Sequence, residues 1–219
     1  MMRLALSKGR LLEPSVEYLR RLGLRVPPEI VEERQLMGVL PDSPIEVVLL
    51  KPADVPVCVA LGAADLGIAG YDQVLESGQR VLVLKDFGFG RADFVVAVPE
   101  DSPVQRLEDL AGCRIATKYP NVARSRIRVP DVRFVPLQGS VEIACSLGLA
   151  DAVFDLRQTG RTLQVHRLRV VAVLGQTTAR LIVSRHRFKM EADRLHRWLR
   201  LFQIPSDAEV AVGRPASSE

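Results

Sequence analysis

Aromatic residues and long apolar runs are scarce in this chain of 219 residues. Phe, Trp and Tyr together make up 5% of the sequence, and the basic residues are scattered rather than grouped in a stripe. Nucleic-acid platforms combine a basic stripe with aromatic rings, so this function class is disfavoured. No apolar run approaches the roughly 20 residues that a membrane span needs.

Cysteine is also rare, and its distribution argues against two kinds of site. Cys58, Cys113 and Cys145 are odd in number, far apart and set among apolar residues. Neither a disulfide framework nor a zinc site has this spacing, so we interpret the three as small core residues in a reducing compartment. The amino-terminal residues become charged too early for a signal peptide. We therefore expect a soluble, cytoplasmic protein.

The composition that is present is ordinary for a globular protein. The chain is 47% hydrophobic and 26% charged, and its formal net charge at pH 7 is +4. A moderate positive charge favours polyanionic partners. It does not distinguish nucleic acid from a phosphorylated metabolite.

Short apolar runs alternate with helical periodicity along the chain. This alternation favours a mostly parallel β-sheet with helices on its faces. The expected strands are residues 3–6, 45–50, 66–69, 81–84, 94–98, 114–117, 132–137, 151–155, 168–174 and 180–183. The expected helices are residues 11–22, 54–61, 141–147 and 190–202, with a further helix after Pro120.

The chain has no low-complexity linker, so two lobes would be joined by more than one crossing of the chain. We expect a two-lobed α/β fold with a ligand cleft between the lobes. Residues 1–90 and 178–205 would form lobe I, and residues 91–177 would form lobe II. Residues 206–219 are small and polar, and we expect a flexible tail there.

Residues 151–163 have the composition of a phosphate-binding turn. A buried strand delivers Asp155, and a Thr-Gly-Arg-Thr turn then opens into a helix start. Gly160 permits a positive φ, so that successive backbone N–H groups converge on one anion, while Thr159 and Thr162 add hydroxyl donors. Asp155 could accept hydrogen bonds from sugar hydroxyls. The pattern indicates a site for a sugar 5′-phosphate, although an ordinary strand-to-helix turn with a threonine cap has the same features.

Together with this loop, four further motifs occur in an order that resembles the ATP phosphoribosyltransferase family. They are residues 5–11 (ALSKGRL), 51–56 (KPADVP), 64–72 (ADLGIAGYD) and 116–121 (ATKYPN). Residues 139–142 (GSVE) precede the loop, as in that family. The resemblance runs from Leu4 to Val183, and it is to the short form of the enzyme, which lacks the regulatory domain.

The resemblance implies a reaction, a cofactor and partners. The adenine N1 of ATP would attack the ribose C1 of phosphoribosyl pyrophosphate (PRPP), and pyrophosphate would leave, in the first step of histidine biosynthesis. Mg²⁺ carried by the diphosphate would assist, without direct protein ligands. A homodimer and a regulatory subunit resembling histidyl-tRNA synthetase are the implied partners, with no nucleic acid or membrane.

The family motifs also assign roles to the residues at matching positions. The catalytic cations would be Lys8, Arg34 and Lys51. The PRPP-binding residues would be Glu142, Asp155, Thr159, Gly160, Arg161, Thr162 and Leu163. The ATP-binding residues would be Arg10, Gly70, Tyr71, Asp72, Lys118 and Tyr119. Taken singly, each cation fits a surface role, and Glu142 fits a solvated carboxylate at a helix start.

Three departures from the family pattern affect details of the site. Lys51 stands where arginine is more usual, which keeps the charge and loses the bidentate fork. Ala92 and Asp93 replace a more typical Cys-Arg pair. His166 lies in a segment that differs from the common one; it fits either a ligand contact or a histidine at a helix end.

Two other function classes compete with this interpretation. A solute- or effector-binding module would share the expected architecture, so the expected fold class is periplasmic-binding-protein-like under either function. Such a module gives no reason for the Thr-Gly-Arg-Thr loop. A purine-salvage phosphoribosyltransferase would place two adjacent acidic residues before its phosphate loop, whereas Leu156 follows Asp155 here.

Overall fold

The computed structural model describes residues 1–32, 34–41, 43–190, 198–204 and 211–212. The chain divides into two compact units: unit 1 is Met1–Gly90 with Thr178–Glu219, and unit 2 is Arg91–Thr177. The chain therefore passes from one unit to the other twice, after Gly90 and after Thr177. The lobe boundaries expected from the sequence fall at the same two points.

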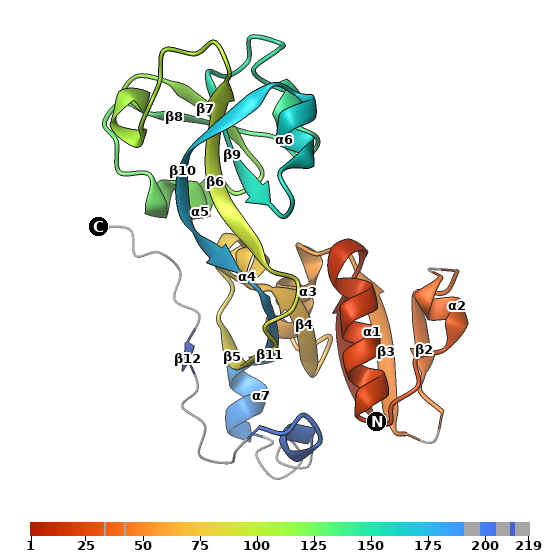
Figure 1. Ribbon diagram of the computed structural model, residues 1–219. Coiled ribbons are helices and arrows are strands. Elements are labelled where there is room, and N and C mark those ends of the chain that lie inside the picture. The colour runs from red at the N-terminus through yellow and green to blue at the C-terminus, as the bar shows by residue number, and fades with distance from the viewer. Residues whose placement is uncertain (33, 42, 191–197, 205–210, 213–219) are drawn as a thin grey trace. The chain divides into compact units, whose positions relative to one another are not determined.

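Unit 1 contains a seven-stranded sheet with the strand order β12-β5-β11-β4-β1-β3-β2 (Figure 1). Its strands are β1 (Met2–Ser7), β2 (Met37–Val39), β3 (Ile45–Leu50), β4 (Leu66–Gly70), β5 (Val81–Asp86), β11 (Ala179–Ser184) and β12 (Ala211–Val212). Its helices are the 3₁₀ helix η1 (Gly9–Leu11), α1 (Leu12–Arg21), α2 (Pro28–Val31), α3 (Asp54–Ala60), α4 (Tyr71–Ser77) and α7 (Arg185–Met190).

The centre of unit 1 is formed by β1, which runs parallel to both β3 and β4. Because successive residues of a strand point to opposite faces, β1 contributes to two cores. Leu4 and Leu6 pack in one core with Leu19 of α1, and Ala5 packs in the other with Val59 of α3. The strands β1, β3 and β4 end at the same side of the sheet, which we call the carboxyl edge of unit 1.

Unit 2 contains a five-stranded sheet with the strand order β10-β6-β9-β7-β8. In its core the rings of Phe94 and Phe154 stack with centroids 5.6 Å apart. Its strands are β6 (Ala92–Pro99), β7 (Arg114–Thr117), β8 (Arg133–Pro136), β9 (Ala152–Arg157) and β10 (Leu168–Thr177). Its helices are η2 (Leu107–Leu110), α5 (Pro120–Arg126), η3 (Val141–Ile143) and α6 (Arg161–Val165).

The expected α/β class is confirmed, and the expectation of a mostly parallel sheet is wrong. Among the strand pairs described here, four are parallel and six antiparallel. An apolar run of a buried strand carries no information about the direction of its neighbour, so the sequence pattern could not distinguish the two arrangements. The return strand β11, antiparallel to β4 and β5, accounts for part of the difference.

The helix expected over residues 141–147 is also wrong. Only the 3₁₀ helix η3 forms, and the chain then turns, with the amides of Leu149 and Ala150 both donating to the Ala144 carbonyl. The reason is burial: Val141 and Ala144 reach the core, whereas Leu147 is 63% exposed, so one apolar face does not extend over two turns. The structure adds α2, β2 and α4, which the sequence pattern did not predict.

Two expectations fall largely outside the described residues. Of the helix expected over residues 190–202, residues 198–201 are described and helical. Of the tail expected at residues 206–219, only Ala211 and Val212 are described, and they pair antiparallel with β5. Among the helices described here, none has the length and apolar character needed to cross a membrane.

Candidate functional site

The loop between β9 and α6 has the backbone that its sequence predicts. Gly160 has a φ of +82° and precedes α6, which confirms the expected left-handed turn. Thr159, Arg161 and Thr162 are exposed, while Leu163 is buried in the core of unit 2 and holds the start of α6. The first amides of a helix have no partner within it, so this loop can present N–H groups to an anion. The Arg161 amide donates a long hydrogen bond, 3.5 Å, to Thr159 Oγ1.

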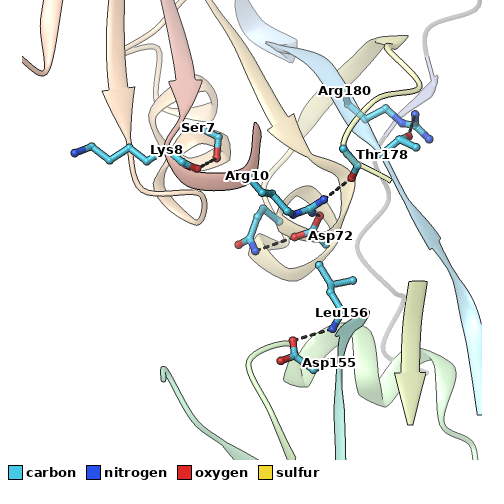
Figure 2. Close-up of polar contacts among 10 residues, drawn as sticks. Ser7, Lys8, Arg10, Asp72, Asp155, Leu156, Thr178 and Arg180 are labelled. Atoms are coloured by element: carbon cyan, nitrogen blue, oxygen red, sulfur yellow. Dashed lines mark hydrogen bonds and ion pairs between the residues drawn. The ribbon is translucent and has the colours of Figure 1, made fainter. Parts of the chain in front are cut away.

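Two carboxylates, Asp155 and Glu142, lie near this loop in unit 2. Asp155 was expected at the carboxyl end of its strand, but β9 continues two residues further, to Arg157. The Asp155 carboxylate accepts a hydrogen bond from the Leu156 amide at 2.8 Å (Figure 2). Within the described residues, Glu142 Oε2 is buried without a hydrogen-bond partner. Buried polar atoms almost always have a hydrogen-bond partner, so this oxygen is suited to accept a hydrogen bond from a ligand.

Lys118, which follows the adjacent strand β7, forms an ion pair with Asp155. Its Nζ lies 3.6 Å from Asp155 Oδ2, and the Asp155 side chain is 15% exposed. Burial raises the pKa of Asp155 above its ordinary value, and the like charge of Glu142 acts in the same direction, while Lys118 opposes both. The cluster therefore combines one partly exposed cation with two acceptors for hydroxyl hydrogen bonds.

Tyr119, expected to bind ATP, lies in the core of unit 2. Tyr119 is 7% exposed, and its ring packs edge-on against the ring of Phe94, with the ring centroids 5.9 Å apart. Its amide donates to Thr117 Oγ1 at 2.8 Å. The ring thus supports the end of β7, next to Lys118, and its contact with ATP stays a prediction.

The carboxyl edge of unit 1 brings together two of the predicted catalytic cations. Ser7 is in register with Leu50 across β1 and β3, so Lys8 and Lys51 each come one residue after a strand end. The Lys8 amide donates to the Leu50 carbonyl at 2.9 Å, which extends the pairing by one bond. Lys51 is exposed. Figure 2 shows Ser7 and Lys8 at the end of β1.

At the same edge, Arg10 and Asp72 contact each other. Arg10 Nη2 lies 3.0 Å from Asp72 Oδ1, and the Asp72 side chain is 3% exposed (Figure 2). The other terminal nitrogen of Arg10 donates to the Gly90 carbonyl. A Cβ on Gly70 would lie 2.3 Å from Asp72 Oδ1, so only glycine fits between β4 and α4. This pair joins η1, α4 and the end of the loop before unit 2.

Residues 51–203 match the family described as ATP phosphoribosyltransferase. The chain belongs to the ATP phosphoribosyltransferase family.

Relatives and solved structures agree with this assignment. The ATP phosphoribosyltransferase of Methanopyrus kandleri is 45% identical over 180 residues, which cover 81% of this chain and 63% of the relative. The chain thus spans slightly less than two thirds of that relative. The ATP phosphoribosyltransferase of Desulfitobacterium hafniense is 37% identical over 202 residues, covering 88% of this chain and 91% of the relative.

Among solved structures, the ATP phosphoribosyl transferase (HisG:HisZ) complex from Thermotoga maritima matches with a TM-score of 0.73 and 27% identity, covering 93% of this chain and 97% of that one. The alkanesulfonate-binding protein SsuA from Xanthomonas axonopodis pv. citri matches with a TM-score of 0.57 and 17% identity, covering 91% and 71%. The second likeness shows the fold alone, and it confirms the expected likeness to periplasmic binding proteins.

Two residues singled out from the family pattern of ATP phosphoribosyltransferases lie apart from these clusters. Arg34 lies between α2 and β2, where it is exposed and forms an ion pair with Glu32. No described contact joins Arg34 to Lys8 or Lys51, so its catalytic role stays a prediction. His166 is the C-cap residue of α6.

The sequence pattern missed one cation near Tyr71. Arg180 lies on β11 opposite Ala69, and its guanidinium carbon is 5.0 Å from the centre of the Tyr71 ring. The Arg180 side chain is 19% exposed and pairs with Asp86. Burial lowers the pKa of this guanidinium below its ordinary value, although an arginine remains charged. The available signal was a single charged residue in the otherwise apolar run 179–183.

The described residues contain no group of three or more His, Cys, Asp or Glu that could hold a metal ion. Glu142 and Asp155 supply two carboxylate groups near the loop. This pair of carboxylates is suited to accepting hydrogen bonds from hydroxyl groups.

Proposed function

We propose that this chain transfers the phosphoribosyl group of PRPP to N1 of the adenine of ATP and releases pyrophosphate. The observation that carries the proposal is the loop at residues 159–163, with its left-handed Gly160 and exposed flanking residues, in a member of this enzyme family. Loops of this geometry present backbone amides to a phosphate. The 5′-phosphate of PRPP is the proposed occupant.

In this proposal the ribose hydroxyls bind the two carboxylates. Glu142 Oε2 has no hydrogen-bond partner within the described residues, and Asp155 Oδ1 accepts one hydrogen bond from the Leu156 amide, so both carboxylates can accept hydrogen bonds from the 2′- and 3′-hydroxyls. Lys118 favours the charged form of Asp155, which is the better acceptor. Binding the sugar at both ends fixes C1 for attack, and such positioning is a large part of the rate enhancement of two-substrate reactions.

The chemical step needs no nucleophile from the protein. The lone pair of adenine N1 forms a bond to C1, while the bond between C1 and the pyrophosphate oxygen breaks and its electron pair leaves with pyrophosphate. Negative charge therefore develops on the leaving group, and cations held in place stabilise it. Lys8 and Lys51, at the carboxyl edge of unit 1, are the proposed cations. Mg²⁺ enters with the diphosphate as part of the substrate.

The proposal is tested by offering the chain different acceptors for the phosphoribosyl group. The purified chain would be incubated with Mg²⁺ and PRPP together with ATP, adenine or hypoxanthine, and the nucleotide product and released pyrophosphate would be measured. We expect product with ATP alone. Product with a free base would indicate a salvage enzyme instead. Binding of PRPP without turnover, also in the presence of a regulatory subunit, would indicate a binding module.

We also propose that the chain functions as a homodimer together with a regulatory subunit. The support is the likeness to a chain of the Thermotoga HisG:HisZ complex. The match covers 97% of the length of that chain. Mixing the chain with a subunit resembling histidyl-tRNA synthetase from the same genome should give a larger species in size-exclusion chromatography with light scattering. It should also give activity that histidine inhibits. Unchanged elution and unchanged activity would contradict the partnership.

A further inference from the structure

Asp93 and Arg157 form a cross-strand ion pair directly before the phosphate loop. The two residues are opposite each other in the register of β6 and β9. Arg157 Nη2 donates to Asp93 Oδ2 at 2.8 Å, and Gln176 Nε2 donates to Asp93 Oδ1 at 3.0 Å. Both carboxylate oxygens of Asp93 therefore have a donor, one from each neighbouring strand.

The pair is charged and only partly accessible. The side chains of Arg157 and Asp93 are 32% and 23% exposed. The hydrogen bond from Arg157 is the main cause that lowers the pKa of Asp93 below its ordinary value. Charge-assisted hydrogen bonds of this kind are about twice as strong as neutral ones and hold a planar guanidinium in one orientation.

This orientation places Arg157 against the turn of the loop. Arg157 is the last residue of β9, three residues before Gly160. A Cβ built on Gly160 would lie 3.6 Å from Arg157 Cδ, so the aliphatic part of the Arg157 side chain lies beside the left-handed turn. Asp93 thus holds the side chain that lies beside Gly160.

The same network reaches the ends of unit 2. Gln176, which binds Asp93, also accepts a hydrogen bond from Arg91 Nη2 at 2.6 Å. Arg91 is the first residue of unit 2, and Gln176 is next to its last residue, Thr177. The network therefore fastens β6, β9 and β10 together where the chain enters and leaves the unit.

We propose that Asp93 is a positioning residue for the phosphoribosyl substrate, because it holds Arg157 and thereby keeps residues 158–162 in the conformation that binds phosphate. This inference rests on the proposed function. It also gives a physical role to the departure at position 93, where the family resemblance implies an arginine.

The first test measures Michaelis constants for both substrates in Asp93→Asn, which keeps the side-chain shape and removes the charge. We expect the KM for PRPP to rise roughly tenfold, from the loss of one charge-assisted hydrogen bond, and the KM for ATP to change less than about twofold. Asp151→Asn is the matched control. Asp151 precedes the other end of β9 and pairs with Arg114 at 3.1 Å, so its loss should leave both constants near wild type. Equal KM values for PRPP in wild type and Asp93→Asn would overturn the inference.

The second test needs no substrate. Hydrogen exchange of the amides at residues 158–163 should be faster in Asp93→Asn than in wild type or Asp151→Asn. Arg157→Lys, which keeps the charge without the fork, should lie between. The charge exchange Asp93→Arg with Arg157→Asp should recover part of the protection and of the PRPP affinity. If wild type does not bind PRPP at all, the proposed function fails while the exchange comparison still decides the role of Asp93. Unchanged loop exchange in all variants would refute that role.

Discussion

Lys118 directly follows β7, Asp155 lies on the neighbouring parallel strand β9, and Lys118 Nζ lies 3.6 Å from Asp155 Oδ2. Thr117 is in register with Phe154, so the residues that follow them are adjacent by construction of the sheet. The charge of Lys118 nevertheless does not restore the pKa of Asp155 to its ordinary value. Burial dominates, and the pKa of Asp155 is raised.

The pH dependence of PRPP binding should reveal this raised pKa. A carboxylate accepts hydrogen bonds best when it is charged, so affinity should fall as the pH is lowered through the pKa of Asp155, starting above the range of an ordinary aspartate. Lys118→Ala removes the opposing cation and should shift this decline to higher pH. Glu142→Gln removes a like charge and should shift it to lower pH. The measurement is PRPP affinity against pH in the three proteins. The titration of the substrate phosphates is the same for all three proteins, so it cancels when their pH profiles are compared. Identical profiles would contradict the role of Asp155 in PRPP binding.

The stability of Asp155→Asn should change with pH in a defined direction. For an acid whose folded-state pKa is raised, the charged form costs stability, and this cost is fully present above the folded pKa. This cost disappears as the pH falls below the ordinary pKa of an aspartate, where Asp155 is neutral in both the folded and the unfolded state. The variant should therefore be more stable than wild type at pH 7, and the difference should shrink on acidification. Urea unfolding at several pH values measures this, and a difference that is constant with pH would contradict the burial argument.

Gly160→Val should abolish PRPP binding while the protein remains folded. A β-branched residue at a φ of +82° costs about 1–3 kcal/mol, so the loop is expected to leave the left-handed conformation that directs its amides. Gly112→Val is the matched control, because Gly112 has a φ of +77°, has no atom within 4 Å of its would-be Cβ and lies outside the loop. Calorimetric titration with PRPP should show loss of binding in the first variant only. Loss in both would indicate a general effect on unit 2.

The conformation of the loop at residues 159–163 could be predicted from the sequence because its determinants are local. The φ of Gly160, the exposed Thr159 and Thr162 and the buried Leu163 all lie within five residues, and a turn of this kind depends on its own residue types. The individual strands other than β2 and β12 were also found, since each needs only a short apolar run. Their directions were not found, because direction is a property of pairs of strands far apart in the chain.

The contacts of the site could be predicted much less well. Arg10 and Asp72 were both expected to bind ATP, and the structure shows that they bind each other across 62 residues of sequence. Arg180 was missed because its partner ring, Tyr71, comes from a distant strand end, and sequence spacing does not show that β11 returns beside β4. Side chains at one edge of a sheet become neighbours because of the order of the strands, and a single sequence does not show this order.

Asp72→Asn should destabilise unit 1. The variant keeps the shape of the side chain but replaces a charged acceptor of Arg10 in a site where Asp72 is 3% exposed. Hydrogen bonds to charged groups contribute about 1.5–3 kcal/mol, so the free energy of unfolding should fall by about that amount. Glu17→Gln is the control: Glu17 pairs with Arg20 and Arg21 on an exposed face, and its loss should leave the urea midpoint nearly unchanged. Equal midpoints in all three proteins would show that the Arg10–Asp72 pair does not stabilise the fold.

Lys51→Ala should reduce turnover far more than stability. Lys51 follows β3 at the carboxyl edge of unit 1 and is exposed, so its removal leaves no cavity in the core. If its ammonium stabilises the leaving pyrophosphate, kcat should fall on the order of a hundredfold, as for the loss of one group that stabilises developing charge. Lys51→Arg should retain most of the rate, since it restores the charge with a fork that suits phosphate. Arg25→Ala, an exposed cation after α1, controls for net charge. Near-normal kcat in Lys51→Ala would remove this residue from the catalytic set and leave Lys8 as the proposed catalytic cation at that edge.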